Sequence, residues 1–328
     1  MQNGYGFRVL ATTAGLCLAK EACQALRRPD LLMEMDIQTH KDGELRLEIK
    51  GNVRGAEIYL FASGQQPDRN LIELLWALDA LRRSAVKRIT VVLPYYPYSR
   101  SDKVEDEKRE PLGAALVARL IERAGADQCL IMDPHNTSIT GMFPQALCDR
   151  IHASRILVPR LKQLLAGRDF VVASPDAGGG PRARKFAKRM GQSTIINFSK
   201  ERVGPGQINP DSIQFQGDVK DKVVIFVDDM IDSAGTILGA VDVALDAGAS
   251  AAIAVAPHAV LSDGAPERIA ASRIEAVLTT NSISHDWSAL PEKIVPVSIG
   301  PMLGHAIHCL HTGESLKELR TFDYDEAA

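Results

Sequence analysis

The stretch Val223–Thr236, with the sequence VVIFVDDMIDSAGT, places acidic and hydroxyl-bearing side chains directly after an apolar run. Asp228 and Asp229 end the strand-like pattern VVIFV, and a segment of helical period begins after the turn DSAGT. The unpaired N–H groups of a helix start, the hydroxyls of Ser233 and Thr236 and the missing side chain of the intervening glycine can close around a phosphate. Ionised carboxylates only accept hydrogen bonds, which suits vicinal sugar hydroxyls or a bound cation. Together these features predict a sugar phosphate site.

A simpler interpretation uses the same residues for structure alone. Asp232 could be the N-cap of the helix, and Asp228 and Asp229 could be polar residues that end a strand. We favour the sugar phosphate site because the whole set of features occurs in one short run.

The elements that would position this site follow a regular rhythm. Short β-branched runs such as RITVVLPYY, QCLIMD and DFVVASPD alternate with helical segments such as PLGAALVARLIERAG and PRARKFAKRMG. This pattern is typical of βαβ units and predicts an α/β fold with a parallel sheet covered on both faces. The rhythm occurs twice, so we expect one domain over residues 1–152 and another over residues 153–328. Ligands of such sheets bind at the carboxyl ends of the strands.

Composition narrows the class of protein. The chain has 328 residues, of which 45% are hydrophobic, and a formal net charge of −3. That charge gives no broad basic surface for nucleic acid. The apolar stretches are too short to span a membrane, and the five cysteines have neither disulfide-framework nor zinc-site spacing. We therefore expect a cytoplasmic protein with a small-molecule partner.

Other polar clusters follow predicted strands. Asp133 and His135 come two residues apart after CLIMD, so strand alternation would place both on one face, although a single histidine is often structural. The segment YSRSDKVEDEKRE could equally be a solvated charged loop. Residues 197–218 show no sustained period, which predicts a long loop of functional importance.

The run VVIFVDDMIDSAGT resembles the phosphoribosyl diphosphate (PRPP) loop shared by type I phosphoribosyltransferases and ribose-phosphate diphosphokinases, also called PRPP synthetases. The stretches VVLPYYPYSRSDK, GAALVARLIERAGADQCLIMDPHNTSITGMF, SPDAGGGPRARKFAKRMG and LHTGESLKEL resemble PRPP synthetases in order and spacing, from about residue 40 to about residue 320. The resemblance implies two phosphoribosyltransferase-like domains, with ATP on the N-terminal side and ribose 5-phosphate on the C-terminal side. It also implies Mg²⁺-dependent transfer of a diphosphoryl group from ATP to ribose 5-phosphate, giving PRPP and AMP.

The same resemblance implies roles for individual residues. Catalysis would involve Lys200, Arg202 and His135. ATP would be bound by Arg100, Ser101, Asp102, His135 and the turn residues His40, Asp42 and Glu44. Ribose 5-phosphate would be bound by Asp228, Asp229, Asp232, Ser233, Ala234, Gly235 and Thr236. The diphosphate loop would be Asp176, Ala177, Gly178 and Gly179, and the metal ligands Asp133, His135 and Asp176.

Several residues depart from the family pattern. Gly180 and Pro181 replace bulkier or polar residues, Ser101 stands where glutamine is frequent, and Glu201 replaces a basic residue. These changes leave open a catalytically silent regulatory subunit, whereas a phosphoribosyltransferase would need only one such domain.

The stretch HKDGELRLEI, residues 40–49, reads as an ordinary hairpin. In the family, a loop at this place reaches into the ATP site of a neighbouring subunit. The resemblance therefore implies a homo-oligomer, based on a dimer and extending to a hexamer.

Overall fold

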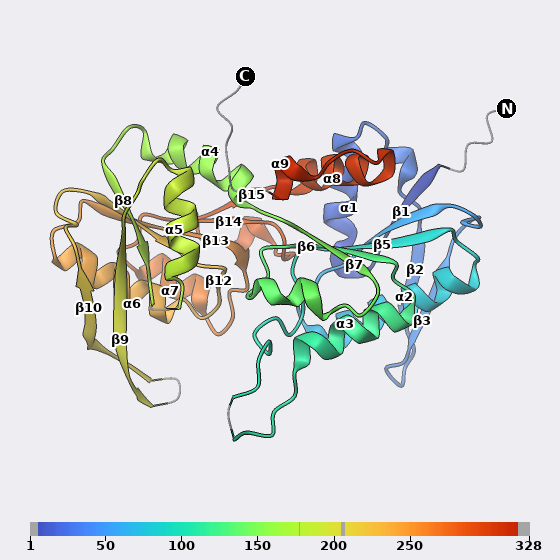
Figure 1. Ribbon diagram of the computed structural model, residues 1–328, viewed down its shortest axis with the longest axis horizontal. Helices are drawn as coiled ribbons and strands as arrows, with labels where there is room; N and C mark the ends of the chain where they lie inside the picture. Colours follow the sequence, from blue (N-terminus) through green and yellow to red (C-terminus); the bar gives the residue numbers. More distant parts are fainter. Residues whose placement is uncertain (1–5, 106, 177, 205–206, 321–328) are drawn as a thin grey trace. The chain divides into compact units, whose positions relative to one another are not determined.

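The computed structural model describes residues 6–105, 107–176, 178–204 and 207–320, with the backbone alone for 200–204 and 207–212. The described chain separates into two compact units, traced in Figure 1. Unit 1 contains the described residues up to His152, together with Ser282–Ser284 and Ile299–Arg320, and unit 2 contains the remainder from Ala153 on. The division of folding domains between residues 152 and 153 stays a prediction. The late segment Ile299–Arg320 packs with the first unit.

Unit 1 is built on a parallel sheet with the strand order β1-β4-β5-β6-β7. Its strands are short apolar runs with nearly every side chain of the inner strands buried, as expected when helices cover both faces. The bounds are β1 (Phe7–Ala11), β4 (Glu57–Phe61), β5 (Arg88–Leu93), β6 (Gln128–Met132) and β7 (Leu147–Ile151).

Helix pairs cover the two faces of this sheet (Figure 1). On one side α1 (Leu16–Ala25) packs against α8 (Gly300–Thr312), and on the other α2 (Pro67–Arg83) packs against α3 (Gly113–Ala124). In α2 and α3, apolar residues spaced three or four apart are buried against every second residue of the strands. That spacing is the one that predicted helices in these segments. These helical residues include Leu74, Leu78, Leu81, Val117 and Ile121.

Smaller elements complete unit 1. As predicted, the chain forms a hairpin near residue 40, from β2 (Met35–Thr39) and β3 (Leu45–Ile49). The 3-10 helices are η1 (Thr13–Gly15), η2 (Pro29–Leu31) and η3 (Thr137–Met142), and the short helix α9 (Lys317–Arg320) follows α8.

Unit 2 contains a mostly parallel sheet with the order β10-β9-β8-β11-β13-β14-β15, and β12 also pairs with β13. The central strand β11 lies between β8 and β13, so its carboxyl end lies at the middle of the sheet. The strands are β8 (Phe170–Ser174), β9 (Ile195–Gly204), β10 (Gln207–Gln216), β11 (Val223–Val227), β12 (Met230–Ile231), β13 (Ala251–Ala259), β14 (Ala276–Thr280) and β15 (Ile294–Val297). The helices are α4 (Ser154–Leu165), α5 (Gly180–Arg189), α6 (Gly235–Asp246), α7 (Ala265–Ala271) and the 3-10 helix η4 (Trp287–Ala289).

The α/β class and the parallel sheets are therefore confirmed, but the predicted loop over residues 197–218 is wrong in its secondary structure. Most of this segment forms an antiparallel hairpin of β9 and β10. The pairing register shifts between Gln207 and Ile208 and again between Ile208 and Ile213. Pro210 lies in the second shift, as expected of a residue that lacks the N–H a ladder needs. This irregularity breaks the period of two that would have revealed the strands.

In the described part of the chain, no helix combines the length and apolar character needed to cross a bilayer. All five cysteines are free thiols.

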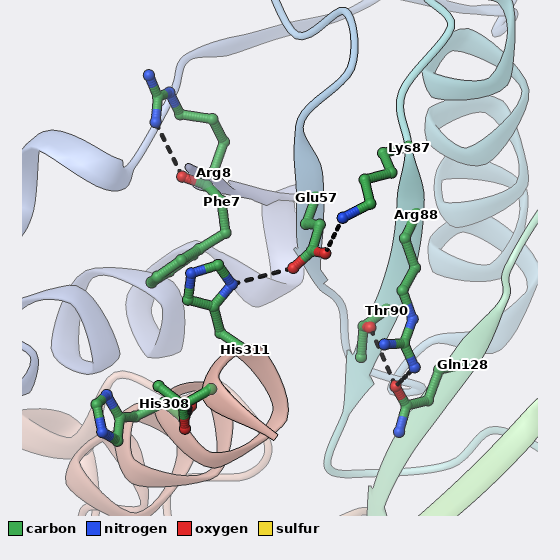
Figure 2. Close-up of polar contacts among 10 residues, drawn as sticks. Phe7, Arg8, Glu57, Lys87, Arg88, Thr90, Gln128, His308 and His311 are labelled. Atoms are coloured by element: carbon green, nitrogen blue, oxygen red, sulfur yellow. Dashed lines mark hydrogen bonds and ion pairs between the residues drawn. The ribbon is translucent and has the colours of Figure 1, made fainter. Parts of the chain in front are cut away.

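A polar ladder runs across unit 1 and ends at the C-terminal helix. Thr90 and Arg88 on β5 donate to the Gln128 Oε1 atom on β6, as Figure 2 shows. Gln128 Nε2 in turn donates to Asp149 Oδ2 on β7 at 2.6 Å. Arg320 of α9 lies 3.2 Å from the other oxygen of Asp149. Buried polar groups of the sheet are thus paired with one another, which avoids the cost of desolvating them alone.

A second polar cluster joins α8 to the first residues of the strands (Figure 2). Glu57, at the start of β4, accepts hydrogen bonds from Lys87 Nζ at 2.9 Å and from the His311 ring at 3.0 Å. The His311 ring also packs against Phe7, with ring centroids 4.6 Å apart. Burial opposes ionisation of Glu57, but the hydrogen bonds from Lys87 and His311 outweigh it and hold the Glu57 pKa below its usual value.

We predict that Glu57→Gln lowers the free energy of unfolding at neutral pH by about 1–3 kcal/mol, because two charge-assisted hydrogen bonds are weakened. The pKa of Glu57 is depressed in the folded state, so this contribution is present above the unfolded pKa and disappears as pH falls through the folded pKa. Urea denaturation between pH 3 and pH 8 measures it. Glu48→Gln, in an exposed ion pair, is the control and should cost little. This role would be contradicted if the difference in free energy of unfolding between the wild type and Glu57→Gln were the same at low pH as at neutral pH.

Candidate active site

The two aspartates of the predicted sugar phosphate site follow β11 and share one arginine. Arg182 Nη1 lies 2.8 Å from Asp228 Oδ1 and 3.1 Å from Asp229 Oδ1. Asp228 Oδ1 also accepts the backbone N–H of Asp229 at 2.8 Å. Arg182 belongs to the first turn of α5, which packs against β8 and β11. A single guanidinium therefore holds both carboxylates at the carboxyl end of the central strand.

Burial and the shared position change the acidity of this pair. Burial, and then the neighbouring Asp229 carboxylate, raise the pKa of Asp228 to about 7, and the Arg182 guanidinium limits the rise. Two adjacent carboxylates cannot both ionise cheaply when one side chain is only 5% exposed and the other 26%. The number of protons bound by the two carboxylates therefore changes near neutral pH.

The turn after the aspartates begins a helix, as predicted. Ala234 has a φ of +63° and is the N-cap of α6, so Asp232 is not the cap and the simpler interpretation fails for that residue. Asp232 instead accepts a hydrogen bond from the Ser262 hydroxyl. Arg268 Nε donates to the Ser233 carbonyl at 3.1 Å. A Cβ added to Gly235 would meet nothing nearer than 4.0 Å, so the space beside the helix start is open.

The predicted diphosphate loop follows β8 and forms a tight turn. Asp176 Oδ1 accepts the Gly179 N–H at 2.9 Å, and the Ser174 hydroxyl donates to the Asp176 carbonyl at 2.7 Å. A Cβ on Gly179 would lie 2.5 Å from Ser174 Oγ, so a larger residue there would displace the Ser174 hydroxyl. Ala177 lies outside the described residues. The loop leads directly into α5 and hence to Arg182.

In unit 1, the structure changes the argument for Asp133 and His135. Strand β6 ends at Met132, and Asp133 adopts a left-handed φ of 37°, so strand alternation does not continue to His135. The Asp133 carboxylate lies 2.5 Å from Nδ1 of His152, a buried residue that follows β7. His135 is exposed.

The other predicted ATP contacts are on surface loops of unit 1. The Ser101 hydroxyl donates to the Pro111 carbonyl at 2.8 Å and accepts the Gly113 N–H at 3.0 Å, so it ties its loop to the start of α3. Arg100 is exposed and Asp102 is half-buried.

The tip of the β2–β3 hairpin exposes His40, Asp42 and Glu44. Asp42 Oδ1 accepts the Glu44 N–H at 3.1 Å, and Gly43 has a φ of +94° that suits the tight turn. The turn therefore presents three polar side chains without using the His40 ring or the Glu44 carboxylate to close itself.

Two further predictions concern the metal and the catalytic cations. Among the described residues, no group of three or more His, Cys, Asp or Glu side chains is placed to hold a metal ion. Lys200 and Arg202 lie two residues apart on β9, and their side chains fall outside the description.

The sequence was compared with protein families and with individual relatives. The profile of the N-terminal domain of ribose phosphate pyrophosphokinase matches residues 7–125, and that of the phosphoribosyl synthetase-associated domain matches residues 170–321. The ribose-phosphate pyrophosphokinase of Chlorobaculum tepidum is 38% identical over 95% of this chain and 94% of its own. The corresponding Aquifex aeolicus protein is 36% identical over 96% and 99%. The chain belongs to the ribose-phosphate pyrophosphokinase family.

A solved structure carries the same family name. The phosphoribosylpyrophosphate synthetase of Mycobacterium smegmatis matches with a TM-score of 0.87 and 34% identity, covering 94% of this chain and 99% of its own. The family members are enzymes, and their fold of phosphoribosyltransferase-like units agrees with the two α/β units found here.

The turn after β11 was evident in the sequence as a candidate site, but the residues that contact this turn were not. Arg182, Ser262 and Arg268 all contact that turn, and His152 contacts Asp133. Arg182 lies 46 residues from Asp228, so no local pattern joins them. The only available signal was an arginine placed in the first turn of a helix that follows a glycine-rich loop.

We predict that ionisation of Asp228 makes stability depend on pH. The folded-state pKa of about 7 lies above the ordinary value of 3.8, so the folded protein binds this proton more tightly. The wild-type free energy of unfolding, compared with that of Asp228→Asn, should therefore fall as pH rises from about 4 to about 7. Denaturant titrations at several pH values measure the difference. Parallel pH profiles for the two proteins would show that Asp228 does not titrate in this way.

Proposed function

We propose that the protein is a ribose-phosphate diphosphokinase. It would transfer the β,γ-diphosphoryl group of ATP to the anomeric hydroxyl of ribose 5-phosphate, giving PRPP and AMP. The observation that carries the proposal is the carboxylate pair and open helix start after β11, beside a tight glycine loop, in a chain of this family.

The ribose 5-phosphate site would consist of the β11–α6 loop. Asp228 and Asp229 would accept hydrogen bonds from the vicinal hydroxyls, since carboxylates are acceptors only. The N–H groups and hydroxyls of Asp232, Ser233, Ala234, Gly235 and Thr236 would surround the 5-phosphate at the α6 N-terminus. The loop of Asp176, Gly178 and Gly179, together with Ala177, would receive the diphosphate of PRPP.

The ATP site would use Arg100, Ser101, Asp102 and His135 of unit 1. We also propose that His40, Asp42 and Glu44 contact the adenine ring of an ATP molecule bound to a neighbouring subunit, because these side chains are exposed at the tip of the hairpin. The protein would then be a homo-oligomer, built from dimers and extending to a hexamer. The five free thiols suit a cytoplasmic location.

Mg²⁺ is the metal that we propose for the reaction. It usually binds one or two carboxylates and completes its shell with water and substrate phosphates, so a cluster of three protein ligands is not required. We propose Asp133, His135 and Asp176 as its protein ligands, because carboxylate oxygens are the donors that Mg²⁺ prefers and the family resemblance adds the His135 ring. When bound, Mg²⁺ would neutralise charge on the phosphate oxygens.

Lys200 and Arg202 would stabilise the charge that develops on the transferring group. The strand β9 that carries them is adjacent to β8, which leads into the diphosphate loop. Cationic side chains that contact the reacting oxygens in a water-poor site stabilise the transition state strongly.

The decisive assay mixes the protein with Mg-ATP and ribose 5-phosphate and separates the nucleotide products. We expect AMP and PRPP in equal amounts, with no AMP when ribose 5-phosphate is omitted. Formation of ADP with ribose 1,5-bisphosphate would show transfer of one phosphoryl group and refute the proposed reaction.

Lys200→Ala and Arg202→Ala should lower kcat far more than they raise KM, because their contacts are stronger in the transition state. We expect each loss to raise the barrier by about 2.7–4 kcal/mol, by analogy with removal of an oxyanion-hole donor. Steady-state kinetics for both substrates measures the split. Lys220→Ala, an exposed lysine of the same unit, is the control. An increase in KM alone would make this segment a binding clamp.

His40→Ala should raise KM for ATP by about two- to tenfold and leave KM for ribose 5-phosphate unchanged, because an aromatic ring contact with adenine is lost. Lys41→Ala, in the same exposed turn, is the control. Sedimentation of the active enzyme should show no monomer. Either an active monomer or unaltered ATP kinetics in His40→Ala would remove the hairpin from the site.

A further inference from the structure

Arg182 has a position that the proposed roles leave unexplained. One of its terminal nitrogens, Nη1, lies within hydrogen-bond distance of both adjacent aspartates, at 2.8 Å from Asp228 and 3.1 Å from Asp229. Its side chain is 32% exposed and that of Asp229 only 5%, so the contact is not a loose surface pair. Arg182 comes from α5, whereas the aspartates follow β11.

The aspartates need such a partner for physical reasons. Adjacent carboxylates repel each other, and burial weakens their hydration, so without a cation one of them would keep its proton. A protonated carboxyl becomes a donor and loses acceptor capacity, which the ribose hydroxyls require. Since a guanidinium nitrogen carries two hydrogens, Nη1 can donate to one oxygen of each carboxylate at the same time.

The geometry also fixes direction. The Oδ1 atom of Asp228 takes Nη1 and the backbone N–H of Asp229, which restrains the rotation of the Asp228 carboxylate. A restrained carboxylate presents its remaining acceptor sites in one direction. The cation thus favours the ionised pair and restrains the direction of its acceptors.

We infer that Arg182 is the positioning residue of the ribose site: it favours the ionised form of Asp228 and Asp229 and orients both carboxylates for the vicinal hydroxyls of the sugar phosphate. Arg182 lies in the first turn of the helix that follows the diphosphate loop, two residues beyond Gly180. The same helix therefore joins the loop for the diphosphate to the acceptors for the sugar. This inference rests on the proposed ribose 5-phosphate site.

The test combines kinetics with direct binding. Arg182→Gln should raise KM and the calorimetric Kd for ribose 5-phosphate by about ten- to a hundredfold, the usual effect of losing hydrogen bonds to charged groups. KM for ATP should change by less than about threefold. Arg182→Lys keeps the charge but not the fork of donors, so it should recover part of the affinity. Lys188→Gln removes the same charge from the exposed last turn of α5 and should leave both constants unchanged.

A double-mutant cycle separates positioning from general structural support. If Arg182 acts through the aspartates, Arg182→Gln should cost less ribose 5-phosphate affinity in an Asp228→Asn background than in the wild type. Full additivity of the two changes would overturn the inference, and so would equal losses for ATP and ribose 5-phosphate. If Arg182→Gln does not fold, Arg182→Lys alone is the test. The inference would be overturned if Arg182→Lys bound ribose 5-phosphate with wild-type affinity while its KM for ATP changed.

The wild-type protein distinguishes this inference from the proposed reaction. Binding of ribose 5-phosphate that depends on Arg182, without AMP release from ATP, would refute the reaction and support the positioning role. AMP release together with ribose 5-phosphate binding that does not depend on Arg182 would support the reaction and refute the positioning role. Failure of the wild type to bind ribose 5-phosphate would refute both.

Discussion

One ion-pair arrangement governs the chemistry of unit 2. Asp228 and Asp229 follow the central strand of the sheet, and their side chains are 26% and 5% exposed. Two ionised groups at such a place need a cation, and Arg182 provides it from a helix on a different βα unit. The guanidinium has to reach both acids. The relative positions of the end of β11, the start of α5 and the turn before α6 are therefore constrained.

The diphosphate loop is constrained by the same helix. Gly179 precedes α5 and has no room for a Cβ, because Ser174 Oγ would lie 2.5 Å away. Ser174 and Asp176 tie the described residues of the loop together through their side chains. A larger residue at Gly179 would displace the Ser174 hydroxyl, and α5, which carries Arg182, begins at the next residue. The loop and the carboxylate pair are thus linked through a single helix rather than through separate contacts.

Sequence reasoning predicted what is local and missed what is distant. The βα rhythm, the β2–β3 hairpin and the helix start after Asp232 were evident because their signals lie within about fifteen residues. The β9–β10 hairpin was not, because register shifts near Pro210 erase the period of two. The pairing of Arg182 with Asp228 crosses 46 residues. The left-handed backbone of Asp133 is uncommon for every residue except glycine, so the residue type alone did not reveal it.

Two carboxylates show how the fold separates stability from chemistry. Glu57, at the amino end of its strand, is surrounded by Lys87 and His311, which outweigh its burial and lower its pKa. Asp228, at the carboxyl end of its strand, has its pKa raised because burial and a neighbouring acid exceed the effect of one arginine. The fold itself thus more than compensates the first charge and compensates the second only in part. An incompletely compensated acceptor at a strand's carboxyl end gains most from a ligand that donates hydrogen bonds, which is the physical reason for proposing the binding site at that end of the sheet.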